Sequence, residues 1–173
     1  MTNANIMAEL TTIDEKILSS IETHGWFVIK VFGDEKEPGF AYSIGLFKTF
    51  KHPEVIMVGL KLDLMHLLIN DIGEEVRKGK KFESQNFYPD IIKNYDCYFT
   101  TVGRECYDAY LGRASWFYGN QDFPVLQCVY PAANNTYPWQ SECPKAIVNF
   151  QPILSGTGTK FPIQQTQNPS DTK

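Results

Sequence analysis

Gly39-Phe-Ala-Tyr-Ser-Ile-Gly-Leu46 is the segment around which this 173-residue chain is organised. Its aromatic and β-branched residues, set between two glycines, favour a strand. An earlier run of the same kind, residues 26–32, is separated from it by the polar turn at residues 33–39. Two such runs joined by a short polar turn predict an antiparallel hairpin. We therefore expect residues 39–46 to form a central strand of a sheet.

Further strand and helix patterns follow the hairpin. Residues 54–60 are almost wholly apolar, which predicts a strand that is buried on both faces. Other strand patterns occupy residues 82–87, 98–102 and 123–130, and residues 47–53 are expected to form a loop. Helical spacing with start and stop signals predicts helices over residues 12–24, 63–78 and 104–118. Together these patterns predict an α+β fold, with a mixed, mainly antiparallel sheet of about five to six strands and about three helices packed on it.

The start and stop signals also define the domain. Thr12 and Asp63 are expected to cap the first two helices, and Gly25 and Gly79 to end them. Residues 1–11 are expected to fray, and residues 12–154 to form a single α+β domain. Residues 155–173 are rich in Thr, Gln, Gly and Pro, which predicts a flexible polar tail. Its expected docking points are Phe161 and Ile163.

Composition excludes several classes of function. The chain has a net charge of −4 and only one close group of basic residues, Lys78, Lys80 and Lys81, so we expect no nucleic-acid binding. No apolar run approaches the ~20 residues of a membrane span, and no secretory signal is visible, which predicts a cytoplasmic protein without a membrane partner. The four cysteines lack CxxC spacing. We therefore expect free thiols, no metal site and no cofactor.

One local cluster suggests acid–base chemistry. His52-Pro53-Glu54 lies where a loop enters the apolar strand, and a carboxylate beside an imidazole can tune it for proton transfer. Ser43 is a candidate nucleophile in such a site, although no residue pattern marks a base for it or an oxyanion hole. In the alternative, Pro53 stiffens the loop and His52 bonds backbone groups. The spacing of Gly39 and Gly45 does not match a phosphate-binding loop.

Aromatic residues suggest a binding pocket instead. Aromatics make up 14% of the chain, and two groups of them, residues 116–118 and 137–139, stand at the ends of expected elements. Aromatic faces can stack a planar ligand, and Gln127 can add amide hydrogen bonds. In the alternative, both groups close the ends of the core. The candidate ligand-binding residues are Tyr42, Ser43, His52, Trp116, Tyr118, Gln127 and Trp139.

Several segments, in order along the chain, resemble an uncharacterised bacterial family, domain of unknown function 4262. The matching residues include His24-Gly-Trp26, residues 39–46, His52-Pro-Glu54, Val76-Arg-Lys-Gly79, Phe123-Pro-Val-Leu-Gln127 and Tyr137-Pro-Trp139. The resemblance covers about residues 12 to 154 and implies a shared fold, with no established activity. The family tends to have acidic residues where this chain has Ala132 and Gln140. That departure favours binding over turnover.

Three functional hypotheses remain open. The first is a non-catalytic binding protein with an aromatic-lined pocket for a small planar or nucleotide-like ligand. The second is a protein-binding immunity or inhibitor module, because an acidic surface can complement a basic partner protein. The third is an enzyme that uses His52 and Glu54 as an acid–base pair. The oligomeric state is left open, a homodimer being one option.

Overall fold

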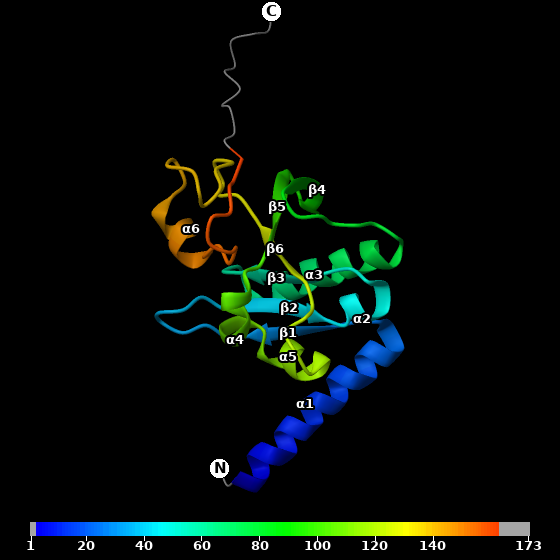
Figure 1. Cartoon of the computed structure of the whole chain (residues 1–173). Helices are drawn as coiled ribbons and strands as arrows, with labels where there is room; N and C mark the ends of the chain where they lie inside the picture. The colour runs from blue at the N-terminus through cyan, green and yellow to red at the C-terminus, as the bar shows by residue number, and fades with distance from the viewer. Residues whose placement is uncertain (1–2, 163–173) are drawn as a thin grey trace, which may run out of the picture.

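The computed structural model describes residues 3–162, with side chains from residue 12 onward. Within this range the chain forms one six-stranded mixed sheet in the order β1-β2-β3-β6-β5-β4 (Figure 1). The strands are β1 Phe27–Val31, β2 Phe40–Ile44, β3 Glu54–Val58, β4 Asn86–Ile92, β5 Tyr95–Thr101 and β6 Val125–Val129. Strands β3 and β6 pair in parallel, and every other neighbouring pair is antiparallel. The predicted α+β class is confirmed.

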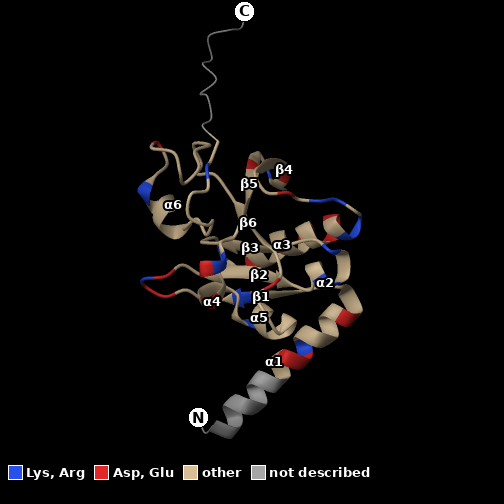
Figure 2. Ribbon diagram, viewed as in Figure 1, with Lys and Arg blue, Asp and Glu red and all other residues tan. Residues whose placement is uncertain are grey.

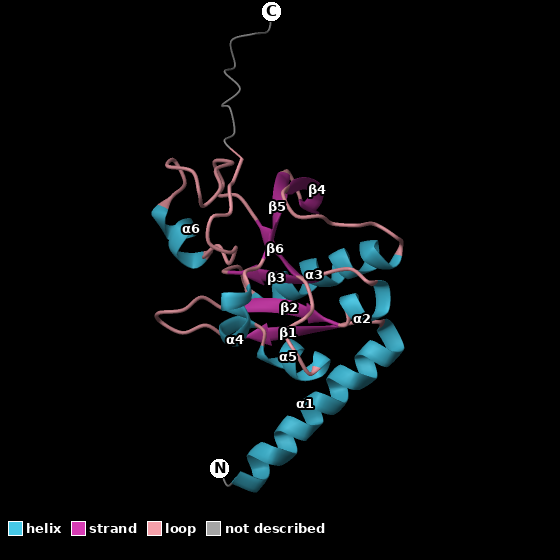
Figure 3. Cartoon of the chain, viewed as in Figure 1, coloured by secondary structure: helices cyan, strands magenta, loops and turns pink. Residues whose placement is uncertain are grey.

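Helices cover both faces of the sheet (Figure 3). The described helices are α1 Asn3–His24, α2 Leu46–Phe50, α3 Leu62–Arg77, α4 Tyr107–Tyr110, α5 Gly112–Tyr118 and α6 Lys145–Phe150, with a short 3-10 turn, η1, at Arg104–Cys106. Of these, α6 stands beside the sheet (Figure 3). Helix α3 packs on one face through residues such as Met65 and Ile69. Ile17 of α1 and Ala114 of α5 pack on the other face. All five residues of β3 are buried, which confirms the prediction of a strand enclosed on both sides.

The expected hairpin is present. Strands β1 and β2 pair from Phe27 opposite Ile44 to Val31 opposite Phe40. Gly45 then turns the chain with φ 111°, and a Cβ atom there would lie 2.7 Å from the carbonyl oxygen of Gly25. Only glycine fits that turn. The turn starts α2, so the prediction of a loop over residues 47–53 was wrong for its first half.

Other boundaries also differ from the predictions. Helix α1 begins at Asn3, before Thr12, and ends at Gly25 as expected. Helix α3 begins after Lys61, whose side chain makes no capping bond; Asp63 lies inside its first turn and pairs with Lys30 at 3.1 Å. The single helix expected over residues 104–118 is divided into η1, α4 and α5. Strand β4 runs from Asn86 to Ile92, so it begins and ends later than the strand expected over residues 82–87, and α6 was not predicted.

The segment after Leu154 packs on the domain as far as it is described. Ser155 forms an isolated antiparallel bridge with Val102. Phe161 stacks on Trp139 with ring centroids 4.7 Å apart, and Trp139 donates its indole N–H to the carbonyl of Pro162. Packing therefore continues beyond the boundary expected at Leu154. Ile163 and the rest of the predicted tail lie outside the described residues.

Candidate functional site

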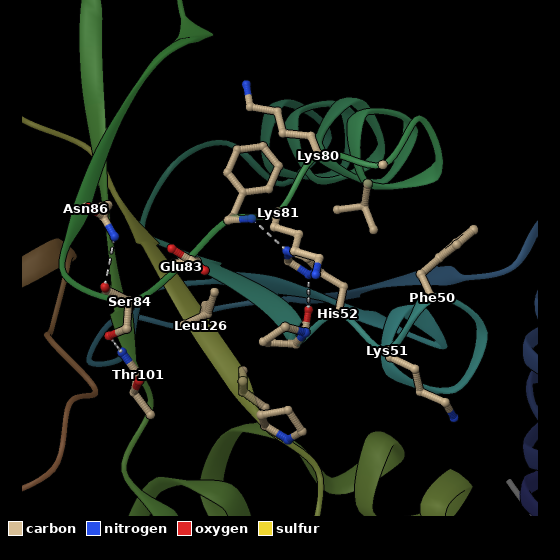
Figure 4. Close-up of a pocket in the computed structure, with 16 residues that line it drawn as sticks. Phe50, Lys51, His52, Lys80, Lys81, Glu83, Ser84, Asn86, Thr101 and Leu126 are labelled. Carbon is tan, nitrogen blue, oxygen red and sulfur yellow. Dashed lines mark hydrogen bonds between the residues drawn. The ribbon is translucent and has the colours of Figure 1, made fainter.

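A cavity of about 590 Å³ opens at the edge of the sheet where the parallel strands β3 and β6 begin. Three parts of the chain form its walls (Figure 4). They are the loop between α2 and β3, the segment after α3, and the adjoining ends of β5 and β6. The Glu54 amide donates a 2.9 Å hydrogen bond to the Pro124 carbonyl and so joins the two strand entrances.

His52 joins two of these walls. Its Nε2 atom accepts a 3.0 Å hydrogen bond from the backbone N–H of Phe82, while Nδ1 donates to the carbonyl of Pro53 at 2.7 Å (Figure 4). An acceptor at Nε2 and a donor at Nδ1 define the neutral imidazole. Burial lowers the pKa of His52, and the nearby charge of Lys81 acts in the same direction. The ring is therefore neutral and bonded to backbone on both sides.

The floor of the cavity is apolar and one wall is polar. Leu126, together with Val76 and Phe82, belongs to the core between the sheet and α3 and also lines the cavity. At the β5 side, Ser84 accepts a hydrogen bond from the Thr101 amide at 3.0 Å through its Oγ atom. Asn86 donates its side-chain N–H to the Ser84 carbonyl at 3.2 Å. This side therefore offers polar groups next to an apolar floor.

Basic side chains surround the opening. The segment between α3 and β4 carries a concentration of lysine (Figure 2). Lys80 and Lys81 of this segment line the cavity, as does Lys51 from the opposite wall, and all three are exposed. Glu83 is the acidic residue that lines it. The lysines at 78, 80 and 81 are visible in the sequence as a close basic group, but no sequence pattern connects them with a site.

Glu54 is fully buried at the start of β3 and accepts bonds from four donors. Oε2 accepts the Ser43 hydroxyl at 2.5 Å; Oε1 accepts the Tyr118 hydroxyl at 2.5 Å and the Gly45 amide at 2.7 Å, with the Phe47 amide at 3.4 Å. Burial raises the pKa of Glu54, and these donors oppose that rise. Burial and the adjacent carboxylate in turn raise the pKa of Tyr118.

His52 and Glu54 lie two positions apart in sequence but have separate hydrogen-bond partners. The imidazole faces the cavity wall and bonds the backbone, whereas the carboxylate bonds β2, the start of α2 and the end of α5. Within the described residues 12–162, no hydrogen bond joins the side chains of His52 and Glu54. Ser43 also accepts the Val55 amide at 2.9 Å, so its hydroxyl is held on both sides. This geometry brings Ser43 and Glu54 together as parts of a bonded network.

The remaining candidate residues lie apart from the cavity. The Tyr42 hydroxyl accepts the Arg113 amide, and burial raises the pKa of Tyr42 to about 12. Gln127 bonds two backbone groups of the segment 152–154, and Trp116 is 45% exposed on α5. Trp139 stacks in a third core cluster at the β5 side of the sheet. Of the seven candidates, His52 is the one that lines the cavity.

A metal site is not visible in the described part of the chain. Residues 12–162 contain no group of three or more His, Cys, Asp or Glu side chains close enough to hold an ion. All four cysteines carry free thiols, and three of them are buried. In the same described range, no helix has the length and apolar character needed to cross a membrane.

Comparison with known proteins gives one match. A family described as "Domain of unknown function (DUF4262)" matches residues 20–144, a range that contains all six strands and every residue that lines the cavity. The chain belongs to this family. No curated protein and no solved structure matches it. In this DUF4262 chain Ala132 is buried in the core, and Gln140 accepts a hydrogen bond from the Tyr137 amide through Oε1. Both residues therefore contribute to the packing or hydrogen bonding of the fold.

Proposed function

We propose that this protein is a non-catalytic binding protein that holds a small planar or nucleotide-like ligand in the cavity beside His52. The observation that carries the proposal is the cavity itself. Its volume of about 590 Å³ falls in the range typical of small-molecule sites, and its apolar floor with a few polar groups at the rim matches their usual composition. A cytoplasmic location is part of the proposal, because free thiols suit a reducing compartment.

The state of His52 and Glu54 favours binding over turnover. A general base needs a lone pair within reach of a substrate proton. The acceptor nitrogen of His52 already takes the Phe82 amide, and both carboxylate oxygens of Glu54 take donors from the protein. Breaking these bonds would leave buried polar groups unsatisfied. Both residues are therefore best explained as structural: His52 joins two walls of the cavity, and Glu54 joins β2 to the start of α2 and the end of α5.

The neutral fluorophore N-phenyl-1-naphthylamine tests the proposal, because its emission rises on entering an apolar site. Saturable binding to the wild-type protein is expected. Thr101→Trp should remove it, since Thr101 is exposed on a strand at the rim and a tryptophan there fills the opening. Thr101→Ser keeps the space open and serves as the control. Binding that is absent, or unchanged in Thr101→Trp, would contradict the proposal.

Equilibrium dialysis against nucleotides and signalling nucleotides tests the nature of the ligand. Retention of one of them by the wild-type protein and its loss in Thr101→Trp would support a nucleotide-like ligand. If the fluorophore binds and no nucleotide is retained, the cavity is a planar-ligand site of another kind.

A further inference from the structure

We propose that the ligand of this cavity is an organic anion, with its charged group beside Lys51 and Lys81 and its planar part on Leu126. The inference rests on the proposed function and adds the chemical class of the ligand. It is carried by the distribution of charge and polarity around the cavity, one feature at a time.

The first feature is the local charge. Three lysines and one glutamate line the cavity, so its net charge is +2 in a chain of net charge −4. A cleft lined by one sign of charge concentrates ions of the opposite sign. The acidic surface elsewhere repels anions, and this makes the cavity the favoured place for one.

The second feature is that these three lysines form no ion pair within the part of the chain that the structure describes. Lys30 and Lys78 pair with Asp63 and Glu75 at 3.1 and 3.0 Å. Among residues 12–162 no such ion pair forms at Lys51, Lys80 or Lys81. Lys80 lies 5.0 Å from the centre of the Phe82 ring, and Lys51 lies 5.8 Å from that of Phe47. The Lys51 ammonium also donates a 3.5 Å hydrogen bond to the Lys48 carbonyl. Within the described residues, no ion pair with a carboxylate neutralises these three charges.

The third feature is the order of groups across the sheet. Leu126 pairs with Val55 on one side and with Thr101 on the other, so it lies in the middle of the cavity floor. In Figure 4, Lys51 and His52 stand on one side of Leu126, and Ser84 with Asn86 on the other. A ligand that spans the floor therefore meets cations at one end and hydrogen-bonding groups at the other.

A matched pair of probes separates charge from shape. N-Phenyl-1-naphthylamine is neutral, and 8-anilinonaphthalene-1-sulfonate is the same ring system with one sulfonate. We would titrate both into the wild-type protein and into the double variant Lys51→Gln/Lys81→Gln. The control is Lys36→Gln/Lys93→Gln, which removes the same charge from two exposed lysines that do not line the cavity.

The Kd of the sulfonate should rise roughly tenfold in Lys51→Gln/Lys81→Gln, as expected for two exposed charge contacts, and added salt should weaken its binding to wild type. The Kd of the neutral probe should stay within about twofold, because its contacts are apolar. The control variant should match the wild type for both probes. Two results would overturn the inference and leave the binding site intact. One is that Lys51→Gln/Lys81→Gln changes the Kd of both probes equally. The other is that the two double variants change the Kd of the sulfonate equally. Sulfonate binding that survives Thr101→Trp would overturn it as well. Failure of both probes to bind would remove the proposed function itself.

Discussion

His52 is hydrogen-bonded to Phe82, a residue thirty positions further along the chain, through a 3.0 Å bond from the Phe82 amide to Nε2. The bond holds the segment after α3 against the loop that enters β3. Both segments are walls of the cavity. The shape of the cavity therefore depends on the neutral state of one imidazole.

Acid should weaken the fold through His52. Its pKa in the folded state lies below the ordinary value of 6.5, so between these two values the unfolded chain binds more protons. The contribution of His52 to the free energy of unfolding is then fully present above about pH 6.5. It is lost as the pH drops toward the folded pKa. Urea denaturation at pH 7.5, 6.5, 5.5 and 5.0 measures this slope.

In His52→Gln the free energy of unfolding should depend less on pH, because glutamine does not titrate. The variant should also be about 1–3 kcal/mol less stable at pH 7.5, since one or both backbone groups lose their partner. His24→Gln, at an exposed helix end, is the matched histidine control. An unchanged slope in His52→Gln would show that other groups cause the acid sensitivity.

Substitutions at Tyr118 and Glu54 should have strongly coupled effects on stability, because the two side chains share a hydrogen bond. Tyr118→Phe removes one donor to a buried carboxylate and should cost about 1.5–3 kcal/mol of unfolding free energy. Glu54→Gln replaces an acceptor oxygen by a donor N–H₂ and should cost a similar amount. The double variant should lose at least about 1 kcal/mol less than the two single variants added together. Additive losses in a double-mutant cycle would contradict a direct bond, and Tyr110→Phe is a suitable tyrosine control.

The turn at Gly45 should tolerate no side chain. Gly45→Ala should destabilise the protein by at least about 2 kcal/mol, because φ is positive and the new Cβ would meet the Gly25 carbonyl. Gly112→Ala should instead stabilise it by about 0.5 kcal/mol, since space is open there and alanine restricts the unfolded chain. Thermal unfolding of both variants tests the contrast. Similar melting temperatures would argue against the turn geometry.

Phe161 should contribute to stability although it follows the main domain. Its ring stacks on Trp139 and touches Tyr98, so Phe161→Ala should cost about 1–2 kcal/mol. Phe150→Ala is a matched control, because that ring is 57% exposed and its loss should cost less than about 0.5 kcal/mol. Denaturant titration followed by tryptophan fluorescence measures both. An equal, small effect would mean that residues after Leu154 do not stabilise the domain.

The central elements were predictable because their patterns are local. The run from Gly39 to Leu46 predicted a strand, and the almost wholly apolar run over residues 54–60 predicted a strand buried on both faces; both are confirmed. Helix α2 was missed because five residues carry too weak a pattern and its start depends on the turn at Gly45. Strand β4 was missed beyond Phe87 because Pro89 and Asp90 interrupt it; Asp90 has φ 69° and lies where the register shifts.

The cavity was not predictable from local patterns. Its walls come from segments that are far apart in sequence, and their meeting depends on the parallel pairing of β3 with β6. Gln127 was expected to face a ligand, but its amide bonds the backbone of residues 152–154, whose path the sequence does not reveal. The lysines at 80 and 81 were visible as a cluster. Their meaning depends on Lys51, which only the folded chain brings to the same opening.

Amide chemical shifts report directly on where a ligand binds. A ¹⁵N-labelled sample would be titrated with 8-anilinonaphthalene-1-sulfonate, and the perturbed amides mapped on the structure. Binding in the cavity predicts the largest shifts at His52, Phe82, Ser84 and Leu126, with little change at Trp139. Shifts that centre on Trp139 and Phe161, or that fail to saturate anywhere, would contradict a ligand site in this cavity.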